Sequence, residues 1–306
     1  MDNVEFTLPV TTPFRLDLTA WALRRRGGNI VDQWSGGRYS RVLVDRDRGV
    51  RVVVVQPGAA AQGVVVTLRS EGQIDDQLQG SARALVQKMF GLSADLTPFY
   101  RLAKGDVLLN DLAAEFAGVR PPRFPSMFEA LVNSVACQQV SLESGIATLN
   151  RLAQKFGVPM VDDGAAQYSF PQPIDLIPLS EEHVKSVGFS RQKARAILGL
   201  ARLFAEDGTD FAHLDQLTNG EAVADLTAIP GIGRWSAEYV LLRGLGRLDS
   251  FPGDDVGAQN NLQRLFERET RPTYDEIRTL VAGWSPYQGF VYFHLLLEKL
   301  RAKGVL

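Results

Sequence analysis

Two different hydrophobic patterns divide the chain, and the first covers about 82 residues. Apolar residues alternate with polar ones at Phe6, Leu8 and Val10, which is the period of a strand with one buried face. Valine-rich runs at 42–44 and 50–55 flank a polar turn and predict a hairpin, and another run covers 64–68. Residues 19–26 suit a short helix. We therefore expect a strand-rich α+β domain over residues 1–82.

From residue 83 onward the apolar positions recur at helical spacing. Ser126 precedes apolar residues at Phe128, Leu131 and Val135, so it predicts a capped helix. The same spacing predicts further helices over residues 141–156, 181–187, 190–205, 274–283 and 286–303. We therefore expect an all-α core over residues 83–306, in which 125–245 form one helical subdomain and 83–120 together with 246–306 form a second.

Composition removes several classes of function. No apolar run reaches the roughly 18 residues that span a bilayer, and no basic segment precedes an apolar stretch at the start. We therefore expect a soluble, cytoplasmic protein with no membrane partner, close to the nucleoid if it is bacterial. The single cysteine, Cys137, and three scattered histidines exclude a side-chain metal cage or an iron–sulfur cluster. The net charge of −2 argues against a protein that coats DNA through bulk charge, so any DNA contact must be local.

A tight glycine turn between two short helices is the most informative motif of the chain. Residues 219–227 predict one helix with Asn219 as its cap, and Ile229-Pro230-Gly231-Ile232-Gly233 follows before a second helix that starts near Arg234. Both glycines permit positive φ and close backbone approach. Such a turn presents free backbone amides at a helix start, which suits a DNA phosphate, and Arg234 adds charge. The alternative is an ordinary helical corner in a core.

These residues resemble the helix–hairpin–helix superfamily of base-excision DNA glycosylases. The resemblance continues at 128–132, 137–141, 188–194 and 284–287, and it includes Phe251-Pro252-Gly253-Asp254-Asp255, with Asp255 22 residues after Gly233. It covers roughly residue 80 to the end. The strand-rich start is similar, more weakly, to the bacterial family of 3-methyladenine-DNA glycosylase II. The resemblance implies an enzyme that flips alkylated bases of the 3-methyladenine type out of damaged double-stranded DNA and hydrolyses their N-glycosidic bond in base-excision repair.

The resemblance also implies roles for single residues. Asp255 is implied as the catalytic carboxylate, because cleavage passes through an oxocarbenium-like sugar that a fixed carboxylate stabilises. Asp254 better suits a helix cap, although both aspartates could be caps. Strand-cutting members of the family carry a lysine where this chain has Trp235, so a monofunctional glycosylase without lyase activity is expected.

Other residues are implied to bind the base or the DNA. The base pocket is implied to contain Trp235, Tyr239, Tyr287 and Phe128, with core packing as the alternative for each. Either Gln138 or Gln139 lies at the wedge that fills the gap left by the flipped base, and we favour Gln139. Further DNA contacts are expected from Ile229, Gly231, Gly233, Arg234, Ser190 and Lys193. The hairpin carbonyls near Ile229 and Ile232 are implied to hold a monovalent cation, and no other cofactor is required.

Basic residues cluster near these motifs, so we expect a local basic surface that binds DNA although the net charge of the chain is negative. The members of the expected basic face are Arg191, Lys193, Arg195, Arg234, Arg243, Arg247, Arg120 and Arg123. We expect the protein to act as a monomer. Two alternatives stay open: a glycosylase for oxidised or deaminated purines, and a non-catalytic protein that uses the hairpin only to grip DNA.

Overall fold

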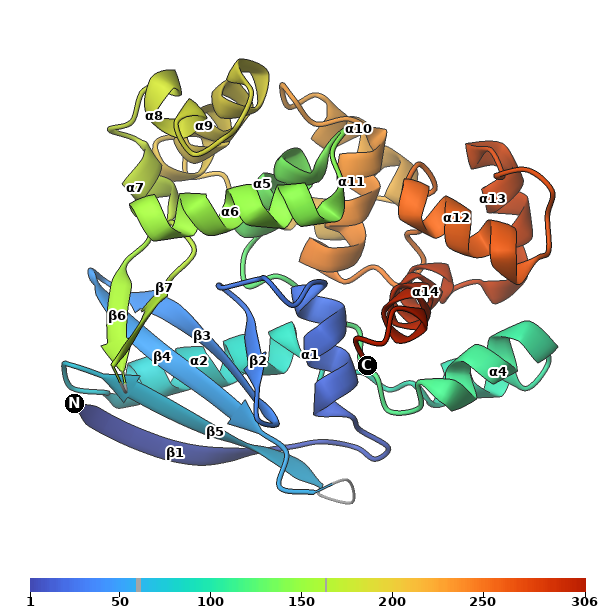
Figure 1. Cartoon of the computed structure of the whole chain (residues 1–306), viewed down its shortest axis with the longest axis horizontal. Coiled ribbons are helices and arrows are strands. Elements are labelled where there is room, and N and C mark those ends of the chain that lie inside the picture. The colour runs from blue at the N-terminus through green and yellow to red at the C-terminus, as the bar shows by residue number, and fades with distance from the viewer. Residues whose placement is uncertain (59–61, 163) are drawn as a thin grey trace.

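The computed structural model describes residues 1–58, 62–162 and 164–306, and its N-terminal part is an antiparallel sheet (Figure 1). In pairing order its five strands are β1 (Asp2–Pro9), β5 (Gly63–Ser70), β4 (Arg48–Val55), β3 (Arg38–Asp45) and β2 (Gln33–Ser35). Alternate residues such as Leu8, Val52 and Val66 are buried on one face. The alternation of the sequence thus becomes the core face of a sheet, as expected.

Helix α2 (Asp76–Met89) packs on this sheet and extends its core beyond residue 82 (Figure 1). Its buried residues Ala82, Val86 and Met89 belong to the same apolar cluster as the strands. The helix therefore straddles the boundary expected at residue 82, because its apolar face completes the sheet's core.

Helix α1 (Leu16–Arg24) joins the sheet to the helical part of the chain. Leu16 and Leu23 pack in the core of the sheet, whereas Leu18 and Ala22 pack in a helical cluster. The helix was expected over 19–26. Instead it begins three residues earlier and ends at Arg24, since Arg25 adopts the left-handed conformation at its C-cap.

The remaining chain forms two helical clusters, which confirms the expected all-α core (Figure 1). The first contains α5 (Met127–Cys137), α6 (Leu142–Phe156), α7 (Pro173–Leu176), α8 (Glu181–Lys185), α9 (Arg191–Ala205), α10 (Asn219–Thr227) and α11 (Arg234–Val240). The second contains α3 (Thr97–Ala103), α4 (Val107–Glu115), α12 (Val256–Leu265), α13 (Tyr274–Leu280) and α14 (Gln288–Ala302).

Short elements complete the fold. A 3-10 turn covers Ala212–Gln216, a π-helical turn continues α11 over Leu241–Leu245, and a second 3-10 turn covers Ala282–Trp284. A small hairpin of β6 (Pro159–Asp162) and β7 (Ala165–Tyr168) occurs where the sequence shows no strand alternation.

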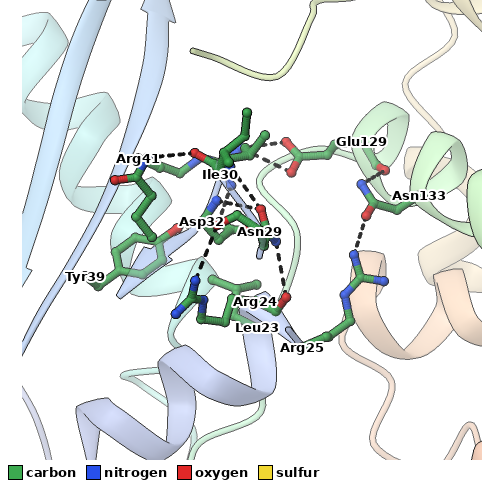
Figure 2. A network of polar contacts seen from close by, with 12 residues as sticks. Leu23, Arg24, Arg25, Asn29, Ile30, Asp32, Tyr39, Arg41, Glu129 and Asn133 are labelled. Carbon is green, nitrogen blue, oxygen red and sulfur yellow. Dashed lines mark hydrogen bonds and ion pairs between the residues drawn. The ribbon is translucent and has the colours of Figure 1, made fainter. Parts of the chain in front are cut away.

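A buried polar network fastens the sheet to α5 (Figure 2). Arg41 of β3 lies between two carboxylates, Asp32 at 3.0 Å and Glu129 of α5 at 2.9 Å. Tyr39 donates a further hydrogen bond to Asp32 at 2.6 Å. Buried charges are tolerated when they are paired and hydrogen-bonded in this way, so the network fixes the orientation of the two parts.

Candidate active site

Asp255 stands immediately before α12, and its carboxylate accepts hydrogen bonds on both oxygens. Oδ1 accepts from the Ala258 amide at 2.8 Å and thereby caps the helix. Oδ2 accepts from Trp235 Nε1 at 3.2 Å and from the Tyr292 hydroxyl at 3.1 Å. Three donors from three different elements hold the half-buried carboxylate in one orientation.

The cap expected from Asp254 is supplied by Asp255 instead. Asp254 turns away from the helix, and its Oδ2 accepts from Arg234 Nε at 2.9 Å. The interpretation of Asp254 as the cap is therefore wrong, because the amide of Ala258 lies against the other carboxylate.

Trp235 and Tyr239 stack on one face of α11. Their ring centres are 5.3 Å apart, and the ring planes are inclined by 26°. Trp235 is half-buried, whereas only 3% of Tyr239 is exposed. Trp235 is therefore the more accessible ring of the pair, and Tyr239 supports it from the protein side.

Tyr292 of α14 is the site residue that sequence reasoning missed. It lies within an apolar helix, and only its bond to Asp255 marks it. Burial, and next the charge of Asp255, raise the pKa of Tyr292 well above its ordinary value. Burial also raises the pKa of Tyr239. Both phenols thus stay protonated at neutral pH, and Tyr292 remains a donor to the carboxylate.

The structure does not bring Phe128 and Tyr287 to this cluster. Phe128 is buried on α5, where its ring centre lies 5.6 Å from that of Phe204, and it lines a separate cavity of about 560 Å³. Tyr287 packs edge-on against Phe99 at 5.6 Å, in the second helical cluster. In the described part of the chain, neither ring pairs with the Trp235 ring, and Tyr287 makes no hydrogen bond to Asp255. Each ring packs instead against an aromatic residue of another helix, Phe204 of α9 or Phe99 of α3.

The two glutamines of the loop after α5 have different surroundings. Gln138 Nε2 donates to the Gly231 carbonyl at 2.9 Å and to Ser236 Oγ at 2.8 Å, which fastens the loop to the hairpin. Gln139 is exposed and has a φ of +53°. Non-glycine residues adopt this conformation rarely, so the turn holds Gln139 at its tip.

Lys193 and Ser190 lie at the start of α9, next to the same loop. Lys193 Nζ donates to the carbonyls of Ala136 at 2.9 Å and Gln138 at 2.7 Å. Ser190 caps α9 by accepting from the Lys193 amide at 3.3 Å. Both residues were expected to contact DNA; in the structure Lys193 supports the loop that presents Gln139, and Ser190 caps α9.

The hairpin depends on one of its two glycines more than on the other. Gly231 has a φ of +91°, and a Cβ there would lie 2.6 Å from Ala196 Cβ. Gly233 has an ordinary φ of −100° and open space around it. Thr218, not Asn219, caps the first helix, because the Thr218 hydroxyl accepts from the Glu221 amide and Asn219 is already helical. The Ile229 carbonyl accepts from the Ile232 amide at 3.0 Å and closes the turn.

The expected basic face is much smaller than the sequence indicated. Arg243 and Arg120 are buried, so neither can meet DNA. Arg195 bonds to Glu181 at 3.0 Å, and Arg191 lies 3.7 Å from Glu182. Arg234 is exposed beside the hairpin, and its guanidinium lies 3.7 Å from the centre of the Tyr274 ring.

Two classes of structural feature are absent from the described ranges. No helix there combines the length and the apolarity that a bilayer crossing requires. Nor do those residues contain a group of three or more His, Cys, Asp or Glu side chains arranged to hold a metal ion.

The chain belongs to the HhH-GPD superfamily of base excision DNA repair proteins, whose family model matches residues 132–286. This segment includes the second half of α5, the hairpin and Asp255, and it ends just before α14. The family confirms the resemblance found in the motifs and the helical fold that it implied.

Individual relatives match over longer stretches. A protein of Bacillus subtilis named DNA-3-methyladenine glycosylase is 33% identical over 69% of each chain. DNA-3-methyladenine glycosylase 2 of Escherichia coli is 30% identical over 95% of this chain and 96% of its own. The solved structure of a 3-methyladenine DNA-glycosylase from Archaeoglobus fulgidus superposes with a TM-score of 0.81 at 24% identity, covering 95% of this chain and 97% of that one. The last comparison shows that the fold extends through the N-terminal sheet.

Proposed function

We propose that this protein is a DNA glycosylase that removes alkylated bases of the 3-methyladenine type by hydrolysing their N-glycosidic bond. The observation that carries the proposal is the Asp255 carboxylate, held by Trp235 and Tyr292 beside a half-buried aromatic face. Relatives of this chain named DNA-3-methyladenine glycosylase support the same substrate class.

Asp255 supplies the charge that the reaction needs. As the glycosidic bond breaks, its electron pair passes to the base and positive charge develops on the sugar. A carboxylate already oriented by three donors stabilises that charge without reorganising. It also accepts a proton from the attacking water, which adds to the anomeric carbon. An N-alkylated purine leaves as a neutral base, so one carboxylate suffices.

Trp235 receives the flipped base, and Gln139 fills the space that the base leaves. A cationic alkylated ring is attracted to the face of an indole. Gln139 lies exposed at the tip of a loop that Gln138 and Lys193 hold against the hairpin, which suits insertion between bases. The hairpin amides and Arg234 meet the phosphates.

The enzyme releases the base and leaves the strand intact. Trp235 occupies the position where the strand-cutting relatives carry a lysine, and an indole cannot form a Schiff base. Denaturing electrophoresis of the product tests this point: an abasic strand that breaks only after alkali treatment is expected. Strand breaks before alkali treatment would contradict a monofunctional reaction.

Backbone carbonyls near Ile229 and Ile232 fit a monovalent cation at the hairpin. The Ile229 carbonyl accepts one hydrogen bond and keeps a second lone pair. Such a cation would bridge the hairpin to a phosphate, and the chemistry at Asp255 does not depend on it. The proposal includes a monomeric enzyme that acts on damaged duplex DNA.

A base-release assay on alkylated duplex DNA tests the function directly. Release of methylated purines that disappears in Asp255→Asn is the expected result. Release of oxidised or deaminated purines alone would reassign the substrate. Tight binding of duplex DNA without release of any base would identify a DNA-binding protein that uses the hairpin only for grip.

A further inference from the structure

Arg25, whose side chain contacts Tyr239 of the base site, has an unusual backbone conformation. It ends α1 with a φ of +63°, and its amide donates to the Trp21 carbonyl at 2.9 Å. Glycine is the usual residue at such a position, since a side chain there costs about 1–2 kcal/mol. Strain of this kind persists where the surroundings demand a particular side chain, so the contacts of Arg25 indicate what it does.

The Arg25 guanidinium is buried, and Figure 2 shows it pointing to Asn133. Its Nη1 donates to the Tyr239 hydroxyl at 2.8 Å, and its Nη2 donates to Asn133 Oδ1 on α5 at 2.5 Å. Tyr239 in turn stacks under Trp235, which donates to Asp255. Two aromatic side chains, Tyr239 and Trp235, therefore connect Arg25 of the N-terminal part to the Asp255 carboxylate.

Arg243 adds a second buried guanidinium at the same place. Its Nη2 donates to the carbonyls of Ala22 and Leu23, at 2.7 and 3.0 Å. The guanidinium carbons of Arg243 and Arg25 both lie 5.3 Å from the centre of the Phe124 ring, and that of Arg243 lies 5.5 Å from the centre of Tyr239. Two buried cations thus lie beside the aromatic residues Phe124 and Tyr239.

Neither cation has an anionic partner within the described ranges. No carboxylate lies at ion-pair distance from Arg25 or Arg243, and Nε and Nη1 of Arg243 make no hydrogen bond there. Arg41, only a short distance along the same network, lies between two carboxylates (Figure 2). Burial lowers the pKa of Arg243, but a guanidinium keeps its charge in proteins. Burying a charge without a counter-charge costs free energy, and in this protein two such charges lie at the base site.

We propose that the charges of Arg25 and Arg243 weaken the preference of the site for cationic lesions, because they promote the departure of bases that are neutral when bound. The inference rests on the proposed glycosylase function. A neutral base such as hypoxanthine takes the electron pair of the broken bond and leaves with negative charge, which the two guanidinium groups stabilise. A cationic base such as 7-methylguanine is repelled on binding, and the repulsion ends only when the electron pair neutralises it.

The test compares release of hypoxanthine and 7-methylguanine from the same duplex sequence. Arg25→Met should lower the kcat/KM for hypoxanthine, relative to the kcat/KM for 7-methylguanine, by at least about fivefold. The reason is that a buried guanidinium interacts strongly with the charge of a nearby base in a medium of low dielectric constant. Asn133→Asp should lower it in the same direction, because it keeps the acceptor oxygen and pairs the guanidinium with an anion. This second variant decides the question if Arg25→Met fails to fold.

Two controls separate charge from structure. Arg25→Lys keeps the charge and should leave the ratio within about twofold of wild type. Arg24→Met removes a neighbouring buried cation whose contacts are to the carbonyls of Gly27, Asn29 and Trp34, and it should lower stability without changing the ratio. An unchanged ratio in folded Arg25→Met or in Asn133→Asp would overturn the inference.

A binding measurement keeps this result apart from the proposed function. If the wild type releases neither these two bases nor 3-methyladenine, the function fails, but fluorescence anisotropy of the two lesion duplexes still decides the role of Arg25. Arg25→Met should then tighten binding of the 7-methylguanine duplex relative to the hypoxanthine duplex. Equal effects on both dissociation constants would refute the electrostatic role.

Discussion

Asp255→Asn separates the two roles that the structure gives to one carboxylate. An asparagine is about as good a helix cap as aspartate, so its oxygen can keep the bond to the Ala258 amide. Its amide group then faces Trp235 Nε1, which loses its acceptor, and Tyr292, whose hydroxyl can turn to accept. The unpaired indole N–H should cost about 1–2 kcal/mol of stability. Loss of the carboxylate charge should slow base release by about 10²–10³-fold.

Single-turnover release of methylated purine, together with urea unfolding, provides the assay. Asp255→Ala should lose the same activity and about 1 kcal/mol more stability, because it also loses the cap. Asp254→Asn is the matched control: it removes only the partly exposed ion pair with Arg234, which is worth at most about 1 kcal/mol, and activity should persist. Near-wild-type release by Asp255→Asn, or a larger loss in Asp254→Asn, would refute the assignment of the catalytic carboxylate.

Three further predictions concern the loop, the turn and the core. Gln139→Ala should weaken binding of damaged duplex more than binding of single strands in an anisotropy titration, and equal losses would count against a wedge. Gly231→Ala should lower the free energy of unfolding by about 1–3 kcal/mol, because the new methyl group meets Ala196, whereas Gly233→Ala should be tolerated. Burial lowers the pKa of His294 to about 4, so stability should fall by about 3 kcal/mol as the pH drops from 6.5 to 4. His294→Phe should flatten that pH dependence, and an unchanged slope would disprove the cause.

Local signals in the sequence identified many of the elements and the motifs at the centre of the site. Ser126 caps α5 as the capping pattern predicts, and the helices expected from residues 141 and 190 begin directly after Ser141 and Ser190. The hairpin and Asp255 lie in motifs a few residues long, so the resemblance could identify them without the fold. Such features depend on neighbours in the chain, which the sequence displays directly.

Contacts between distant segments could not be found in this way. Arg243 was expected on a basic face, yet it is buried against carbonyls of α1 more than 200 residues earlier in the chain. Tyr292 was missed because an aromatic residue in an apolar helix looks like core until its partner, Asp255, is placed beside it. Phe128 shows the converse, since the resemblance implied a place in the base pocket while its ring packs against Phe204 inside the first helical cluster.

The site is assembled where three apolar clusters meet, and this explains why the N-terminal part belongs to the enzyme. Trp235 comes from the first helical cluster, Asp255 and Tyr292 come from the second, and Arg25 follows α1, which also packs in the sheet. Arg41 and Glu129 lock that sheet to α5. A shift of the sheet would therefore move Arg25 relative to Tyr239, so the geometry of the base site depends on packing far from the carboxylate. The family match begins at residue 132, but Tyr239 within it accepts a hydrogen bond from Arg25, which lies outside it.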